Sequence, residues 1–136
     1  MCHDNAYSEI SFDGYIPPSF LETDGAKDVG VEFHSLSKTY NMAGWRVGFL
    51  VGNSDILKYV EKFKSYLDYG IFTAIQLAGA SALDSSQKYV EENCKQYLHR
   101  RDKFIHYLEK IDWHVNKMSM LKFHFVLILT DFMMHT

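Results

Sequence analysis

The fold of this chain is decided by residues 35–48, which read SLSKTYNMAGWRVG. This segment joins two apolar runs, residues 29–33 and 47–51, which we interpret as β-strands. In the first run, Val29, Val31 and Phe33 alternate with Gly30, Glu32 and His34, as is typical of a half-buried strand. The polar residues between the runs therefore lie in a loop at a strand end, where functional side chains gather.

The loop combines an amine with phosphate-binding groups. Lys38 can form a Schiff base with an aldehyde if burial or a neighbouring cation lowers the pKa of its amine. Arg46 and Ser35 suit a phosphate, because a guanidinium bonds two oxygens at once and a hydroxyl adds another donor. A ligand with both an aldehyde and a phosphate describes pyridoxal 5'-phosphate.

Two residues near the start of the chain suit the ring of the same ligand. Asp4 follows the presumed end of a strand, and a carboxylate that faces the pyridine nitrogen keeps it protonated. The hydroxyl of Tyr7 can bond the ring oxygen.

These motifs together resemble a known family. The order Asp4-x-x-Tyr7, Ser35-x-Ser37-Lys38 and Gly44-x-Arg46-x-Gly48 resembles the class I and II aminotransferases of fold type I, the aspartate aminotransferase fold. The sequence of residues 3–10 and 66–72 is most similar to the LL-diaminopimelate aminotransferase-like branch. The similarity runs from the first residues to about Val115.

The resemblance implies a transaminase that moves an amino group from an L-amino acid, of the aspartate or LL-diaminopimelate type, to a 2-oxo acid. Lys38 would be the catalytic residue and would hold the cofactor as an internal aldimine. The family is usually a homodimer, and the sequence does not say whether this chain dimerises. The implied cofactor-binding residues are Asp4, Tyr7, Ser35, Ser37, Lys38 and Arg46.

The resemblance covers only the middle of a family member, which leaves alternatives open. The glycine-containing phosphate loop, the ring-stacking aromatic and the arginine for the substrate carboxylate have no counterpart here. We therefore expect a truncated chain with weak or no turnover. The alternatives are a non-catalytic fragment, or a lyase or decarboxylase that uses the same cofactor. Residues 117–136 diverge from the family, and we hypothesise that the reading frame was lost near Lys117.

The expected architecture is α/β, with two parts. Residues 1–83 would form the C-terminal part of the cofactor-binding large domain, including part of its mostly parallel sheet. Residues 84–136 would form a long connecting helix and the start of a small α+β domain. We expect strands at 1–3, 29–33, 47–51, 113–116 and 123–129. We expect helices at 19–22, at 74–83, at 87–111, and from a cap at Ser54 to a break at Gly70. The apolar stripe of the long helix would be Val90, Cys94, Tyr97, Phe104, Leu108 and Ile111.

The composition excludes several classes of function. The net charge of −3 gives no reason to expect nucleic acid or an anionic membrane as a partner. The longest apolar run is much shorter than the ~20 residues that span a bilayer. Cys2 and Cys94 lack a paired spacing, so we expect free thiols in the cytoplasm. No histidine belongs to a ligand set, so we expect no metal site.

Overall fold

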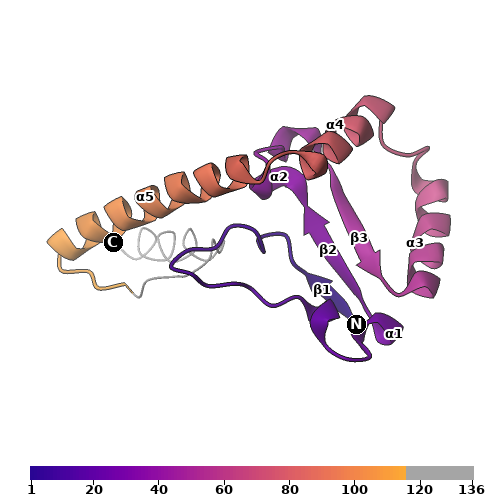
Figure 1. Ribbon diagram of the computed structural model, residues 1–136, viewed down its shortest axis with the longest axis horizontal. Helices are drawn as coiled ribbons and strands as arrows, with labels where there is room; N and C mark the ends of the chain where they lie inside the picture. The colour runs from indigo at the N-terminus through magenta and orange to yellow at the C-terminus, as the bar shows by residue number, and fades with distance from the viewer. Residues whose placement is uncertain (116–136) are drawn as a thin grey trace, which may run out of the picture.

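The computed structural model describes residues 1–115, which form a small sheet flanked by helices and one long helix that extends away from it (Figure 1). The strands are β1 (Cys2–Asp4), β2 (Val31–Ser35) and β3 (Gly48–Gly52). The helices are α1 (Ala26–Val29), α2 (Leu36–Thr39), α3 (Ser54–Leu67), α4 (Thr73–Asp84) and α5 (Lys88–Lys110), with 3-10 turns η1 (Phe20–Glu22) and η2 (Ala43–Trp45). The α/β class predicted from the sequence is confirmed.

The three strands form one sheet in the order β1-β2-β3, with β2 in the centre. β1 runs parallel to β2 and pairs His3 with Glu32, whereas β3 runs antiparallel and pairs Val51 with the same residue. Within the described residues the sheet is therefore mixed. β2 begins later than predicted, because Val29 is the last residue of α1 and Gly30 is the C-cap of that helix.

The two faces of β2 differ from a simple alternating pattern. Glu32 lies on the polar side of the alternation, yet its exposed fraction of 1% equals that of Val31 on the other side. Phe33 remains 44% exposed. The start of β2 is therefore buried on both faces, whereas its middle is exposed on one. A charged side chain such as Glu32 is tolerated in the interior only if partners satisfy it.

α3 begins at a cap that we predicted one residue too late. The side chain of Asn53 accepts hydrogen bonds from the N–H groups of Asp55, at 3.1 Å, and Ile56, at 2.9 Å. Ser54 is instead the first residue of the helix. The amide of Asn53 also donates to the carbonyl of Asp28 at 2.9 Å, so the cap ties α3 to α1.

α5 carries a mixed apolar and polar stripe. Val90 and Leu108 are buried, as predicted, whereas Ile111 is 68% exposed. Ile105 and Asn93 are buried although the predicted stripe omitted both. The helix is therefore packed along one side, and one position on that side is an amide.

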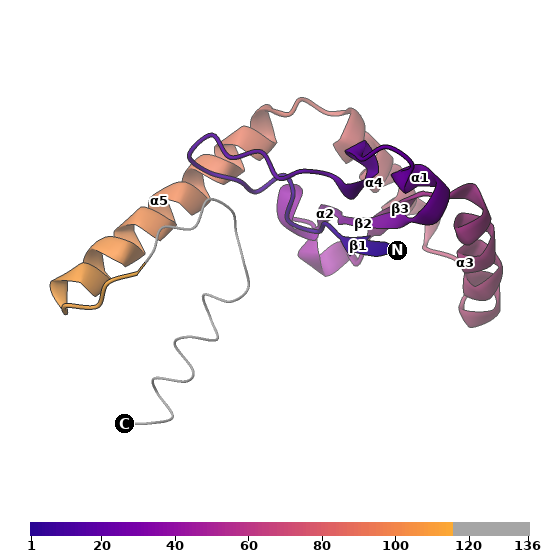
Figure 2. The ribbon, with the colours of Figure 1, turned by 90° about the horizontal axis from the view of Figure 1, so that it is seen from below.

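The loop from β1 to η1 packs against α5, as Figure 2 shows. The thiol of Cys94 donates to the carbonyl of Glu9 at 3.1 Å. Further along the helix, Arg101 binds Asp13 at 2.5 Å, and its guanidinium lies over the buried ring of Phe12 at 5.2 Å. These contacts join the beginning of the chain to its longest helix.

The last described residues differ from the prediction. Residues 113–115 adopt no regular secondary structure, so the predicted strand is not found there. The strand expected at 123–129 lies outside the described residues. Across residues 1–115, no helix has both the length and the apolar character needed to cross a membrane. Both cysteines have free thiols.

Candidate functional site

Lys38 lies where β2 passes directly into α2. Ser35 ends the strand and caps the helix, because its hydroxyl accepts the N–H of Ser37 at 3.2 Å. Lys38 is half-buried in the single turn that follows. The local sequence therefore folds as a strand, a serine cap and one helical turn, which positions the amine at the edge of the sheet.

Asp4 and Tyr7 come to this edge because β1 is parallel to β2. Asp4 ends β1 and pairs in register with Phe33, so the carboxyl ends of both strands lie together. The Lys38 amine lies 5.9 Å from the centre of the Tyr7 ring. Burial raises the pKa of Tyr7, and the nearby charges of Asp4 and Tyr97 raise it further. A carboxylate, a phenol and an amine are thus brought together by two strands.

Arg46 is the C-cap residue of η2. The carbonyl of the next residue, Val47, accepts the N–H of Leu36 at 3.3 Å, so the chain just after Arg46 contacts the start of α2. The backbone of Arg46 is left-handed, with φ of 54°, and its exposed guanidinium donates to the carbonyl of Ala43 at 3.0 Å. The predicted role of Arg46 in binding phosphate remains a prediction.

Glu32 is a buried carboxylate in the central strand, and no motif in the sequence predicted its role. His3 and His34 each approach it at 2.8 Å. The amide of Asn5 donates at 2.9 Å, and the remaining donors are the hydroxyl of Ser19 and the N–H of Phe20. The register of β1 on β2 could have revealed this cluster, since it pairs His3 with Glu32.

Burial of the Glu32 carboxyl would raise its pKa, but the hydrogen bonds outweigh burial and lower the pKa to about 2. The group is therefore an anion at neutral pH, and it serves to join β1, β2 and the start of η1. Two histidines and one carboxylate form a hydrogen-bonded cluster here. Within residues 1–115, no group of three or more potential metal-binding side chains is arranged as a metal site.

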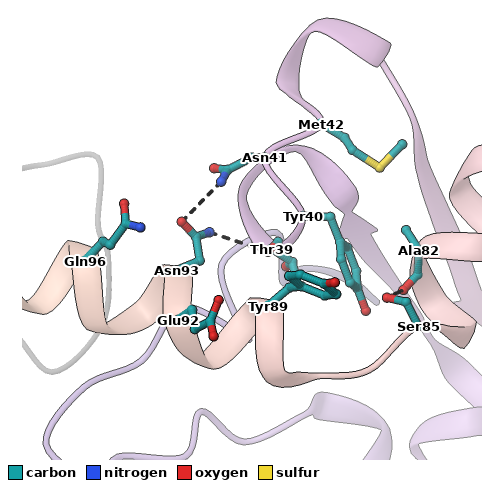
Figure 3. Close-up of a pocket in the computed structure, with 10 residues that line it drawn as sticks. All are labelled: Thr39, Tyr40, Asn41, Met42, Ala82, Ser85, Tyr89, Glu92, Asn93 and Gln96. Atoms are coloured by element: carbon teal, nitrogen blue, oxygen red, sulfur yellow. Dashed lines mark hydrogen bonds between the residues drawn. The ribbon is translucent and has the colours of Figure 1, made fainter.

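Asn93 is the second residue that sequence reasoning missed. It lies beside a cavity of about 400 Å³ between the end of α2, the end of α4 and the start of α5 (Figure 3). Its amide donates to the carbonyl of Lys38 at 3.0 Å, and its oxygen accepts from Asn41 at 3.3 Å. An asparagine among the apolar positions of α5 was the available signal, because asparagine is a poor helix former.

The gathered side chains fit the cofactor that the sequence predicts. Lys38, Tyr7 and Asp4 supply an amine, a phenol and a carboxylate, the donor set that an aldehyde, a ring oxygen and a pyridine nitrogen require. Ser35 borders a second cavity, of about 360 Å³, together with His34 and Phe49.

Comparison with known proteins gives consistent matches. The family model described as aminotransferase class I and II matches residues 1–127, which extends past Val115. An LL-diaminopimelate aminotransferase of Dehalococcoides mccartyi is 56% identical over 115 residues, covering 85% of this chain and 30% of that protein. One of Desulforudis audaxviator is 49% identical over 117 residues, covering 86% and 30%.

Solved structures also match this chain. The apo-BacF structure from Bacillus subtilis superposes with a TM-score of 0.84 at 40% identity, covering 88% of this chain and 30% of that one. An aminotransferase from Staphylococcus aureus gives a TM-score of 0.80 at 39% identity, covering 88% and 31%. The chain thus spans about 30% of the length of the curated relatives it matches.

Proposed function

The chain belongs to the class I and II aminotransferases, and from this membership we propose that it carries the lysine-bearing segment of a pyridoxal-phosphate-dependent transaminase. The substrates would be an L-amino acid, of the aspartate or LL-diaminopimelate type, and a 2-oxo acid. The observation that carries the proposal is the approach of the Lys38 amine to Tyr7, beside Asp4 at the end of the neighbouring strand.

Each residue has a separate task in this proposal. When bound, the cofactor supplies an electron-accepting ring and an aldehyde. Asp4 would hold a proton on the ring nitrogen, and the Tyr7 hydroxyl would donate to the ring oxygen. The Lys38 amine would hold the aldehyde carbon, with loss of water, and the free amine would serve as a general base.

The phosphate would be held by Ser35, Ser37 and Arg46. Ser35 caps α2 and Ser37 lies in its single turn, and the Ser37 N–H donates to the Ser35 hydroxyl at 3.2 Å. Binding requires the guanidinium of Arg46 to leave the Ala43 carbonyl, a local and exposed contact that costs little to break. The charge-assisted bonds gained are worth ~1.5–3 kcal/mol each.

A second proposal concerns turnover. We propose that the chain alone turns over weakly or not at all, because it spans about 30% of its relatives' length. Many large apolar side chains are also exposed, among them Tyr59, Phe63 and Tyr66. These exposed side chains favour a non-catalytic chain that associates with another chain.

The test is to mix the purified chain with pyridoxal phosphate, reduce with borohydride and locate the pyridoxyl group by mass. Borohydride converts the bond between amine and aldehyde carbon into a stable secondary amine. We expect the label on Lys38 and its loss in Lys38→Arg, whereas Lys58→Arg, at an exposed position on α3, keeps it. Label spread evenly over surface lysines would refute the cofactor role.

Turnover is measured separately, with L-aspartate or LL-diaminopimelate and a 2-oxo acid. Formation of a new amino acid supports transamination, whereas release of ammonia or carbon dioxide indicates a lyase or decarboxylase. Rapid turnover by the purified chain would contradict the second proposal.

A further inference from the structure

We propose that Asn93 is a positioning residue for Lys38, through which α5 holds the main chain of the cofactor lysine in place. This inference rests on the proposed function of Lys38. It concerns how the lysine is held and does not require Asn93 to touch the cofactor.

The main-chain carbonyls at the end of α2 are paired by a side chain of α5. The last carbonyls of any helix lack partners within that helix, and α2 is a single turn that ends at Thr39. The amide of Asn93 donates to the carbonyl of Lys38 at 3.0 Å and to that of Thr39 at 3.5 Å. Asn93 is only 8% exposed, so water has little access to replace it.

The side-chain amide of Asn93 is oriented by contacts at both its ends. Asn41 donates to the oxygen of Asn93 at 3.3 Å, so the nitrogen must point toward α2 (Figure 3). Close by, the hydroxyl of Tyr40 approaches the side-chain amide of Gln87 at 3.4 Å. The segment after Lys38 is therefore attached to the start of α5 at more than one point.

The same part of α5 also holds the segment bearing Tyr7. Cys94, next to Asn93, donates to the carbonyl of Glu9. Tyr97, one turn later, is close enough to raise the pKa of Tyr7. Adjacent residues of one helix thus fix the two segments whose side chains meet, and α5 sets the distance between the Lys38 amine and the Tyr7 ring.

The first experiment measures amide hydrogen exchange in the full chain without cofactor. The reporters are the N–H groups of Tyr40 and Met42, which both bond the carbonyl of Leu36. Asn93→Leu removes the donor and Asn93→Asp replaces it with a carboxylate. We expect both to speed exchange at the reporters about fivefold, the effect of losing one hydrogen bond. The N–H of Val31, bonded to Met1 in the sheet, should be unchanged.

Gln96→Ala is the matched control, because Gln96 lines the same cavity one turn further along α5. In Gln96→Ala, the amide hydrogen-exchange rates of all reporter N–H groups should equal those of the wild type. If the Asn93 variants fail to fold, Asn41→Ala decides, with an expected increase of about twofold through looser orientation of Asn93. Folded Asn93 variants, or a folded Asn41→Ala protein, with wild-type exchange would overturn the proposal.

The second experiment measures the yield of Lys38 labelling by pyridoxal phosphate and borohydride, relative to Lys58, as a function of pH. We expect the Asn93 variants to lower the ratio about fivefold and shift its pH midpoint, whereas Gln96→Ala retains both. An unchanged ratio and midpoint in the Asn93 variants would overturn the positioning role. A wild-type chain without preference for Lys38 would refute the proposed function, and the exchange rates would still decide whether Asn93 holds the main chain.

Discussion

At the scale of single residues, the carboxylate of Glu32 is the most heavily bonded group described above. It is 1% exposed and accepts hydrogen bonds from side chains on two strands and from the main chain at Phe20. A buried carboxylate without partners would be strongly destabilising. Its charge is therefore part of what joins β1 to β2 and holds the following loop.

Replacing Glu32 with glutamine tests this role. The variant keeps one oxygen but turns an amide group toward donors such as Asn5 and His3, so we expect a loss of about 3 kcal/mol in the free energy of unfolding. Urea denaturation measures it. Glu61→Gln, on the exposed side of α3, should change stability by less than about 0.5 kcal/mol. Equal stabilities for both variants would contradict the role.

The low pKa of Glu32 also predicts how stability depends on pH. In the unfolded chain a glutamate titrates at about 4.3, whereas the folded pKa is about 2. The unfolded chain therefore binds this proton more readily, and the stabilisation is complete above about pH 5 and disappears as the pH falls toward 2. Between pH 6 and pH 3, the free energy of unfolding from urea denaturation should fall by about 1.7 kcal/mol more in the wild type than in Glu32→Gln. An equal loss of stability in the wild type and in Glu32→Gln would exclude Glu32 as the cause.

At the scale of elements, the cap of α3 shows how one side chain can join two helices. The Asn53 oxygen accepts two N–H groups of α3, and its amide donates to the end of α1. The effect of this residue should therefore exceed that of an ordinary cap.

Asn53→Ala should lower the free energy of unfolding by about 2 kcal/mol, the upper end for a helix cap. Ser54→Ala, at the cap position that the sequence suggested, should have an effect below about 0.5 kcal/mol because Ser54 is already helical. Denaturation followed by circular dichroism distinguishes them. If Ser54→Ala destabilised the protein more than Asn53→Ala, Ser54 would be the cap residue.

The long elements were predictable, and the residues that join them were not. The spacing of apolar residues placed α4 and α5 to within one residue at each start, because periodicity over many residues averages out local exceptions. The single turns α1 and α2 are too short to show any periodicity. The roles of Glu32 and Asn93 depend on contacts with β1 and α2, which are distant in sequence, so no local pattern contains them.

The candidate site was predictable in part, for the same reason. The sequence placed Asp4 and Lys38 each at a strand end, and the parallel pairing of β1 with β2 then brings these ends together. The roles of Lys38, Tyr7 and Asp4 remain predictions. The left-handed backbone at Arg46, which helps to orient its guanidinium, could not be predicted from the sequence. Its predicted role in binding phosphate remains a prediction.

At the scale of the whole molecule, the exposed apolar surface of α3 and α4 is large. Tyr59, Phe63, Tyr66 and Leu77 are each more than 60% exposed. Within the described residues, β1 and β3 also each have a strand neighbour on one side only. Surfaces and edges of this kind favour association.

We therefore expect the purified chain to self-associate as its concentration rises, which light scattering after size-exclusion chromatography would show. Phe63→Lys should weaken the association by interrupting the apolar surface. Ser65→Lys introduces the same charge on the same helix and should have a smaller effect. A chain that stays monomeric throughout the concentration series would contradict this expectation.

Because α5 is long, a small rotation of the helix about Asn93 produces a large movement of its far end. From Asn93 to Lys110 the helix rises roughly 25 Å, at about 1.5 Å per residue. If the helix pivots at Asn93, a tilt of about 5° displaces its far end by roughly 2 Å while the pivot hardly moves. A pull on the distal end would thus reach the Lys38 carbonyl as a small torque.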